Sequence, residues 1–104
     1  MIIATSHTVE DKKIVKTLGL VRGNTIRARH VGRDIMALLR NLVGGEVTEY
    51  TKLMGESREQ AIDRMVQNAE ELGANAIVSA RLTTSMLMGG AAEIVAYGTA
   101  VVME

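Results

Sequence analysis

The chain lacks cysteine entirely, and it also has no proline, phenylalanine or tryptophan. Without cysteine it can have no disulfide, no thiolate metal site and no cysteine nucleophile, a composition that fits a cytoplasmic protein. Tyr50 and Tyr97 are the only aromatic residues, although 47% of the residues are hydrophobic. The sequence therefore predicts a core of small aliphatic side chains and methionine.

The 104 residues also lack repeats, low-complexity runs and proline-marked linkers, so we expect a single domain spanning residues 1–104. The amino terminus has no basic region followed by an apolar run, and no segment approaches the roughly 20 apolar residues of a membrane span. We therefore expect a soluble cytoplasmic protein with no membrane partner.

The net charge is zero, but it is unevenly distributed. Residues 1–40 contain eight Lys or Arg and three acidic residues, which gives +5, and the remainder of the chain carries −5. A basic half can bind nucleic acid, but a pI near 6.7 and the lack of stacking aromatics favour solvated surfaces that complement one another. We expect no nucleic-acid partner.

Alternating apolar residues predict strands at both ends of the chain. The stretch "KIVKTLGLVRGNTIRA" indicates a strand, a bend or bulge marked by Gly19 and by Gly23–Asn24, and more strand. The runs "NAIVSARLTTSM" and "EIVAYGTAVV" are rich in β-branched residues and predict a hairpin joined by "LMGGAA".

The middle of the chain changes to a helical period. "GRDIMALLRNLVGG" predicts a helix that ends at Gly44–Gly45, and the apolar seam after it predicts a long helix from about Glu46 to Leu72, with Gly73 as its cap. A break after Gly55 is the alternative, because Ser57 and Gln60 can form a capping box. The predicted fold is α+β, an antiparallel sheet packed by two helices.

The segments "LGLVRG", "GGEVTEYT", "LGANAIV" and "EIVAYGTAV", in this order, resemble the YbjQ-like family. This family consists of small uncharacterised bacterial and archaeal proteins that are often labelled heavy-metal-binding. The resemblance covers nearly the whole chain. It implies an α+β subunit of a closed ring, a pentamer, whose sheets contribute to a shared barrel, and it implies no demonstrated activity.

The last predicted strand is apolar on both faces, which fits such an assembly. Alternate residues face opposite ways, so Ile94, Ala96, Gly98, Ala100 and Val102 share one face. Helices can cover one face only, and other copies of the chain are expected to cover the other. The small side chains at 96, 98 and 100 would also let another backbone come close.

Candidate metal ligands are scattered along the chain. His7 and His30 have no H-x-x-H or H-E-x-x-H spacing, so ordinary surface or capping histidines are one interpretation. The other is a site assembled across subunits from His7, His30, Glu46 or Glu93. Met86 and Met88 beside Gly89–Gly90 offer two thioethers to a soft ion such as Cu(I), or they fill irregular gaps in the core. A metal ion is thus a candidate cofactor.

No enzyme motif stands out. Ser57, Ser79 and Ser85 have no nucleophile-elbow sequence around them, and Gly44–Gly45–Glu46 lacks the remainder of a phosphate loop. Arg81, placed on a predicted strand face with Ile77, would need an acid such as Glu93 if that face were buried.

The sequence thus predicts a non-enzymatic, homo-oligomeric cytoplasmic protein that binds a small ligand or a metal ion at subunit interfaces. The alternative is a structural or partner-binding ring without a small ligand. A third hypothesis is an enzyme whose site lies between subunits.

Overall fold

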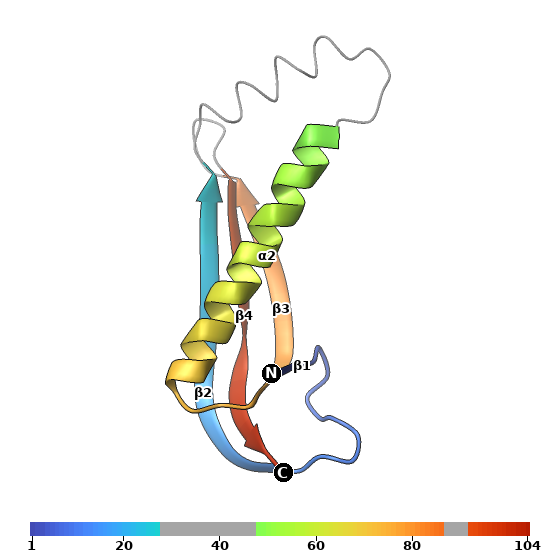
Figure 1. Cartoon of the computed structure of the whole chain (residues 1–104), viewed down its shortest axis with the longest axis vertical. Helices are drawn as coiled ribbons and strands as arrows, with labels where there is room; N and C mark the ends of the chain where they lie inside the picture. Colours follow the sequence, from blue (N-terminus) through green and yellow to red (C-terminus); the bar gives the residue numbers. More distant parts are fainter. Residues whose placement is uncertain (28–47, 87–91) are drawn as a thin grey trace.

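The computed structural model describes residues 1–27, 48–86 and 92–104. The described elements are β1 (Ile2–Ile3), β2 (Ile14–Arg27), α2 (Thr48–Glu71), β3 (Ala76–Met86) and β4 (Ala92–Met103). Figure 1 shows α2 crossing one face of the sheet, and the predicted α+β class is confirmed. The helix predicted over residues 32–45 and the hairpin loop at 87–91 lie outside the described residues.

The sheet has four strands in the order β1-β3-β4-β2. The predicted hairpin of β3 and β4 is confirmed, and β2 pairs antiparallel with the other side of β4. The prediction of an antiparallel sheet is wrong at one edge, because β1 pairs parallel with β3, placing Ile2 opposite Ala76 and Ile3 opposite Ile77. Two residues are too few to show an alternating pattern, so β1 left no signal in the sequence.

The predicted bulge in β2 is confirmed at Gly19, which has a φ of 122° where the register shifts against β4. The strand then continues without a bend through Gly23 and Asn24. Gly23 is instead a packing position, because the backbone of α2 lies directly against it. A Cβ atom there would collide with the carbonyl oxygen of Ala61 and the amide nitrogen of Met65. Glycine at this position lets the helix backbone approach the strand closely.

Helix α2 is continuous through Gly55, as the apolar seam predicts, so the break after Gly55 does not occur. Ser57 does not start a second helix. It is fully buried, and its carbonyl oxygen accepts a hydrogen bond of 3.2 Å from Thr25 Oγ1. The stop at Gly73 is also confirmed, since Gly73 has a φ of 86° and its N–H donates to the carbonyl of Glu70. The Ala74 N–H donates to the carbonyl of Ala69, which completes a Schellman motif.

Two apolar clusters lie on opposite faces of the sheet. The larger one fills the space between α2 and the sheet, and its buried members are Val21, Ala61, Met65, Ala69, Ile77, Ala80, Ile94, Ala96 and Ala100. The smaller one is on the other face, near the carboxyl end of β4. It consists of Ala76, Val78, Val101 and Met103, with Val9 and Ile14 packed against it.

The small residues of β4 therefore face the chain's own helix, and the expectation that they admit another subunit is corrected. A Cβ atom on Gly98 would lie 2.6 Å from Cγ2 of Ile77, within the same sheet. The close approach predicted at Gly98 is real, but it is made inside one chain.

Candidate functional site

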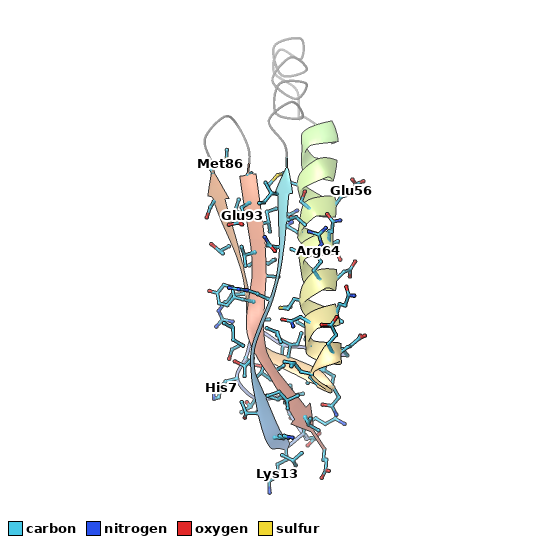
Figure 2. The ribbon with its side chains drawn as sticks, turned by 90° about the vertical axis from the view of Figure 1, so that its left-hand side faces the viewer. His7, Lys13, Glu56, Arg64, Met86 and Glu93 are labelled. Carbon is cyan, nitrogen blue, oxygen red and sulfur yellow. The ribbon has the colours of Figure 1, made fainter. Side chains whose placement is uncertain are left out.

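The predicted metal ligands that the structure describes do not meet within one subunit. Figure 2 shows His7 at the lower end of the molecule and Glu93 and Met86 at its upper end. The segment of His7 is bonded to β3 at Ser79, whereas Glu93 pairs with Ser85, which is about 20 Å further along the strand. In the described part of the chain, no three His, Cys, Asp or Glu side chains gather where they could hold a metal ion.

Each of these residues has a definite local environment. His7 is exposed, in the loop after β1. Glu93 is half-buried on β4 and its Oε2 accepts a 3.5 Å hydrogen bond from Asn24 Nδ2. Met86, the last residue of β3, is 72% exposed, and it lies on the opposite face of the sheet from Glu93 because its register partner is Ala92. His30, Glu46 and Met88 lie outside the described residues.

The sheet surface opposite α2, beyond the smaller cluster, is uncovered by any residue that the structure describes. We call it the open face. It is built from alternate residues of three strands: Leu20, Arg22, Asn24 and Ile26 of β2, Glu93, Val95, Tyr97 and Thr99 of β4, and Arg81, Thr83 and Ser85 of β3. Leu20 is 68% exposed, Ile26 57% and Tyr97 39%. Large apolar side chains thus share this surface with charged ones.

One row across the open face brings two arginines to the same tyrosine. In the register of the sheet, Tyr97 stands opposite Arg22 on one side and opposite Arg81 on the other. Residues opposite each other on neighbouring strands have Cβ atoms about 5 Å apart. Glu93 is the only acid of the open face, four positions along β4 from Tyr97. The centre of the open face is therefore positively charged.

Arg81 is held in place by the amino-terminal segment. Its side chain is exposed, so it does not need the acid that a buried position would require, and within the chain it does not pair with Glu93. Its Nη1 donates to the carbonyl oxygens of Thr5 at 2.7 Å and of Ala80 at 2.8 Å. A guanidinium has five N–H donors, so donors remain for a ligand. Arg22 makes no side-chain hydrogen bond or ion pair to the residues that the structure describes.

Arg81 and Glu93 share the open face but are four residues apart along the sheet, because Arg81 stands opposite Tyr97 and Glu93 opposite Ser85. A bulge in β3 decides which face Arg81 occupies. The register advances from Val78 opposite Thr99 to Arg81 opposite Tyr97, so β3 has one residue more than β4 between these pairs. Ser79, in the bulge, has a φ of 54°. One extra residue exchanges the two faces of the strand after it. Ile77 therefore faces α2, whereas Arg81 faces the open side.

Arg22 was not predicted as a site residue from the sequence. Its neighbours in the chain, Val21 and Gly23, face the helix, and strict alternation along β2 was the available signal for its exposure. What the sequence did not contain was the register that places Arg22 beside Tyr97.

These features define a small α+β protein with a helix on one face of a mixed sheet and an apolar, basic surface on the other. The chain matches the family described as "Putative heavy-metal-binding" over residues 1–104, and it belongs to this YbjQ-like family. No helix within the described ranges is both long and apolar enough to span a membrane.

Relatives of high identity include UPF0145 proteins of three organisms. The chain is 61% identical to one from Methanosarcina acetivorans over 101 residues, which cover 97% of this chain and 95% of the relative. It is 59% identical to one from Clostridioides difficile and 58% identical to one from Pyrococcus horikoshii. These two alignments cover 100% of this chain, and 93% and 89% of the respective relatives.

A solved structure shows the same fold. It is a protein of unknown function from Pediococcus pentosaceus that belongs to the DUF74 family. The TM-score is 0.67 and the sequence identity is 15%, with 100% of this chain and 98% of that chain covered. At this identity the likeness supports the fold alone.

Proposed function

We propose that this protein is a non-enzymatic, cytoplasmic homo-oligomer that buries its open face between copies and binds a small ligand there. The observation that carries the proposal is the exposure of Leu20, Ile26 and Tyr97 on one side of the sheet. Burial of apolar surface yields about 25 cal/mol per Å², so covering these side chains stabilises an assembly. Several large apolar side chains exposed on one face of a sheet are suited to an interaction site. A closed ring of five is the assembly that the family resemblance implies.

The charges of the open face indicate the class of ligand. Arg22 and Arg81 flank Tyr97, and arginine binds carboxylates and phosphates through paired N–H groups. The ring of Tyr97 adds a flat apolar surface for the rest of the ligand. We therefore propose a small carboxylate- or phosphate-bearing ligand.

A metal ion is the other ligand class, suggested by the family description. Within one subunit Ser6, the neighbour of His7, is bonded to Ser79, whereas Glu93 pairs with the distant Ser85. Such a site therefore requires donors from more than one copy or from outside the described residues. Histidine and carboxylate would then suit a divalent ion, whereas Met86 would suit a soft one.

Native mass spectrometry of protein purified without chelator tests the assembly and the ligand together. We expect a closed oligomer whose mass exceeds that of the bare chains by a bound small molecule or ion. Leu20→Lys should lower the native mass to that of smaller species, because it places a charge in the buried face. Leu72→Lys is the matched control, since Leu72 is 47% exposed but lies at the carboxyl end of the helix, away from the open face.

A monomer at micromolar concentration would contradict the proposal. An oligomer that carries no additional mass would instead favour the structural ring without a small ligand. If a ligand is retained, Arg22→Gln distinguishes the two ligand classes. The variant should lose the additional mass of a bound anion, whereas the mass of a bound metal ion should be unchanged.

A further inference from the structure

The open face contains one acidic side chain, Glu93, which the proposed anion site does not use. Glu93 is half-buried on β4, where it stands opposite Ser85 of β3 and Ile26 of β2 (Figure 2). Its Oε2 accepts the 3.5 Å hydrogen bond from Asn24 Nδ2, and it has no other bond and no ion pair to the described residues. A carboxylate can accept about four hydrogen bonds, so most of its capacity is unused. A cationic N–H donor from a ligand would be favourable beside it.

The register of the sheet determines how far Glu93 lies from the two arginines. Arg22 and Arg81 flank Tyr97, and Glu93 lies four positions from Tyr97 on the same face of β4. A strand rises about 3.3 Å per residue, so the two positions are about 13 Å apart. Because the charged groups are at the ends of side chains with several rotamers, a ligand whose own charges are about 10–13 Å apart can reach both. The open face is thus positive at one end of this span and negative at the other.

The row between the two charged positions suits an uncharged part of a ligand. Val95 is half-buried there, with Asn24 opposite it on β2 and Thr83 opposite it on β3. Valine offers an apolar contact, whereas the amide and hydroxyl side chains donate and accept hydrogen bonds. We therefore expect the middle of the ligand to combine apolar groups with hydrogen-bonding ones.

We propose that the ligand of the open face is a zwitterion, a short extended peptide with free ends. Its carboxylate binds between Arg22 and Arg81, and its ammonium group binds Glu93. An extended chain spans about 3.3–3.6 Å per residue, so about three or four residues place the end groups 10–13 Å apart. The peptide bonds supply the hydrogen-bonding groups that suit the row of Val95. The inference rests on the proposed function, because it assigns a ligand class to the anion site proposed there.

Other ligands of similar charge fit this face less well. A ligand that is anionic at both ends would bring a like charge close to Glu93, which is unfavourable. A single amino acid is too short to extend from the arginines to Glu93. A cation from a second copy of the chain is the other group that could pair with Glu93, and the experiment below distinguishes it.

Calorimetric titration of the full chain with tetraalanine tests the ligand class. We expect N-acetyl-tetraalanine, which lacks the ammonium group, to bind about tenfold more weakly, because the charged hydrogen bond to Glu93 is lost. Dialanine should also bind about tenfold more weakly, since it is too short to reach both charged positions. Equal affinity for tetraalanine and N-acetyl-tetraalanine would overturn the inference.

Two variants and a control assign the preference to the named residues. Glu93→Gln keeps the size of the side chain but removes its charge, so the preference for the free amino end should disappear. Arg22→Gln should weaken both peptides by the same factor, because both retain the carboxylate. Glu59→Gln, which changes an exposed residue of α2 on the opposite side of the sheet, should leave the preference unchanged.

The outcomes separate this inference from the proposed function. If Glu93→Gln retains the preference, or changes the native mass of the protein without changing the preference, Glu93 does not bind the ammonium group and the inference is overturned. Binding of N-acetyl-tetraalanine that depends on Arg22 would still support the anion site. If tetraalanine, N-acetyl-tetraalanine and inorganic phosphate all fail to bind the parent protein, the inference and the proposed anion site are both overturned.

Discussion

The side chain of Asn75 and the backbone of Met103 exchange two hydrogen bonds. Asn75 Nδ2 donates to the carbonyl oxygen of Met103, and the Met103 N–H donates to Asn75 Oδ1, each at 2.8 Å. The amide side chain thus extends the hydrogen bonding of the sheet by one pair. It does so in the connection between α2 and β3, beside the end of β4. It fastens the helix-to-strand connection to the carboxyl end of the chain.

Asn75→Ala should therefore destabilise the fold by about 1–3 kcal/mol, because two backbone groups of Met103 lose their partner. Chemical denaturation measures the change. Asn75→Asp keeps the acceptor but sets a carboxylate oxygen against the Met103 carbonyl. The repulsion favours the protonated acid and raises the pKa of this carboxyl in the folded state above its unfolded value. The stability deficit of this variant should therefore shrink as the pH falls through the raised pKa, and it should level off below about 4. A deficit that is independent of pH would argue against the reciprocal pair.

The contact between Gly23 and α2 predicts opposite effects of two glycine substitutions. Gly23→Ala should destabilise by about 2–4 kcal/mol, because the new methyl group meets helix backbone at Ala61 and Met65. Gly55→Ala should stabilise by about 1 kcal/mol, since the nearest atom to its methyl group is Arg58 Nη2 at 3.9 Å and alanine is the better helix former. Denaturant midpoints of both variants check this, and equal midpoints would show that α2 can move away from β2.

The bonds from α2 to the outer edge of β2 predict a role in preventing aggregation. Figure 2 shows Arg64 on the helix, whose Nη1 lies 2.5 Å from the Asn24 carbonyl oxygen. Removing this side chain together with Asn68 frees two edge groups of β2, and exposed strand edges associate. We expect Arg64→Ala/Asn68→Ala to aggregate at lower temperature than the parent, measured by light scattering during heating. The control is Glu59→Ala/Gln67→Ala, two exposed helix residues with no bond to β2; equal aggregation of both pairs would count against the edge role.

The metal hypothesis predicts a dependence on histidine. A divalent site that uses His7 or His30 with Glu93 or Glu46 should lose affinity as the pH drops through roughly 6.5, because histidine must be neutral to bind. Calorimetric titration with Zn²⁺ and Cd²⁺ at two pH values, on the parent and on His7→Ala/His30→Ala, measures this. Tight Cd²⁺ binding that survives in the double variant would show that other ligands are used.

The sequence predicted several local features correctly because they depend on neighbours in the chain. An apolar seam at helical spacing extends through Gly55, and the helix follows it without a break. The strand bulge at Gly19 and the helix stop at Gly73 both correspond to positive φ angles, which glycine adopts at little cost. The β3–β4 hairpin followed from β-branched runs on either side of a glycine-rich loop.

The candidate site was less predictable. The proposed metal ligands were chosen for their chemistry, and chemistry alone does not tell which residues share an end of a sheet. His7 and Glu93 are therefore chemically suitable as metal ligands, but they lie far apart in the fold. The sequence predicted the open face in part. Both faces of the last strand are apolar, and helices can cover only one of them. Its arginine row was not, because Arg22, Tyr97 and Arg81 come from three strands.

By itself, the sequence determined helix α2, the β3–β4 hairpin, the bulge at Gly19, the helix stop at Gly73 and an apolar excess that one helix on one face does not cover. Each of these is set by the spacing of side chains within about ten residues. Only the tertiary structure decided the rest: the parallel pairing of β1, the extra residue at Ser79 that turns Arg81 to the open face, and the seating of α2 on Gly23. The physical reason is that register and close packing are properties of pairs of segments. A shift of one residue exchanges the two faces of a strand without changing the pattern of the segment it pairs with.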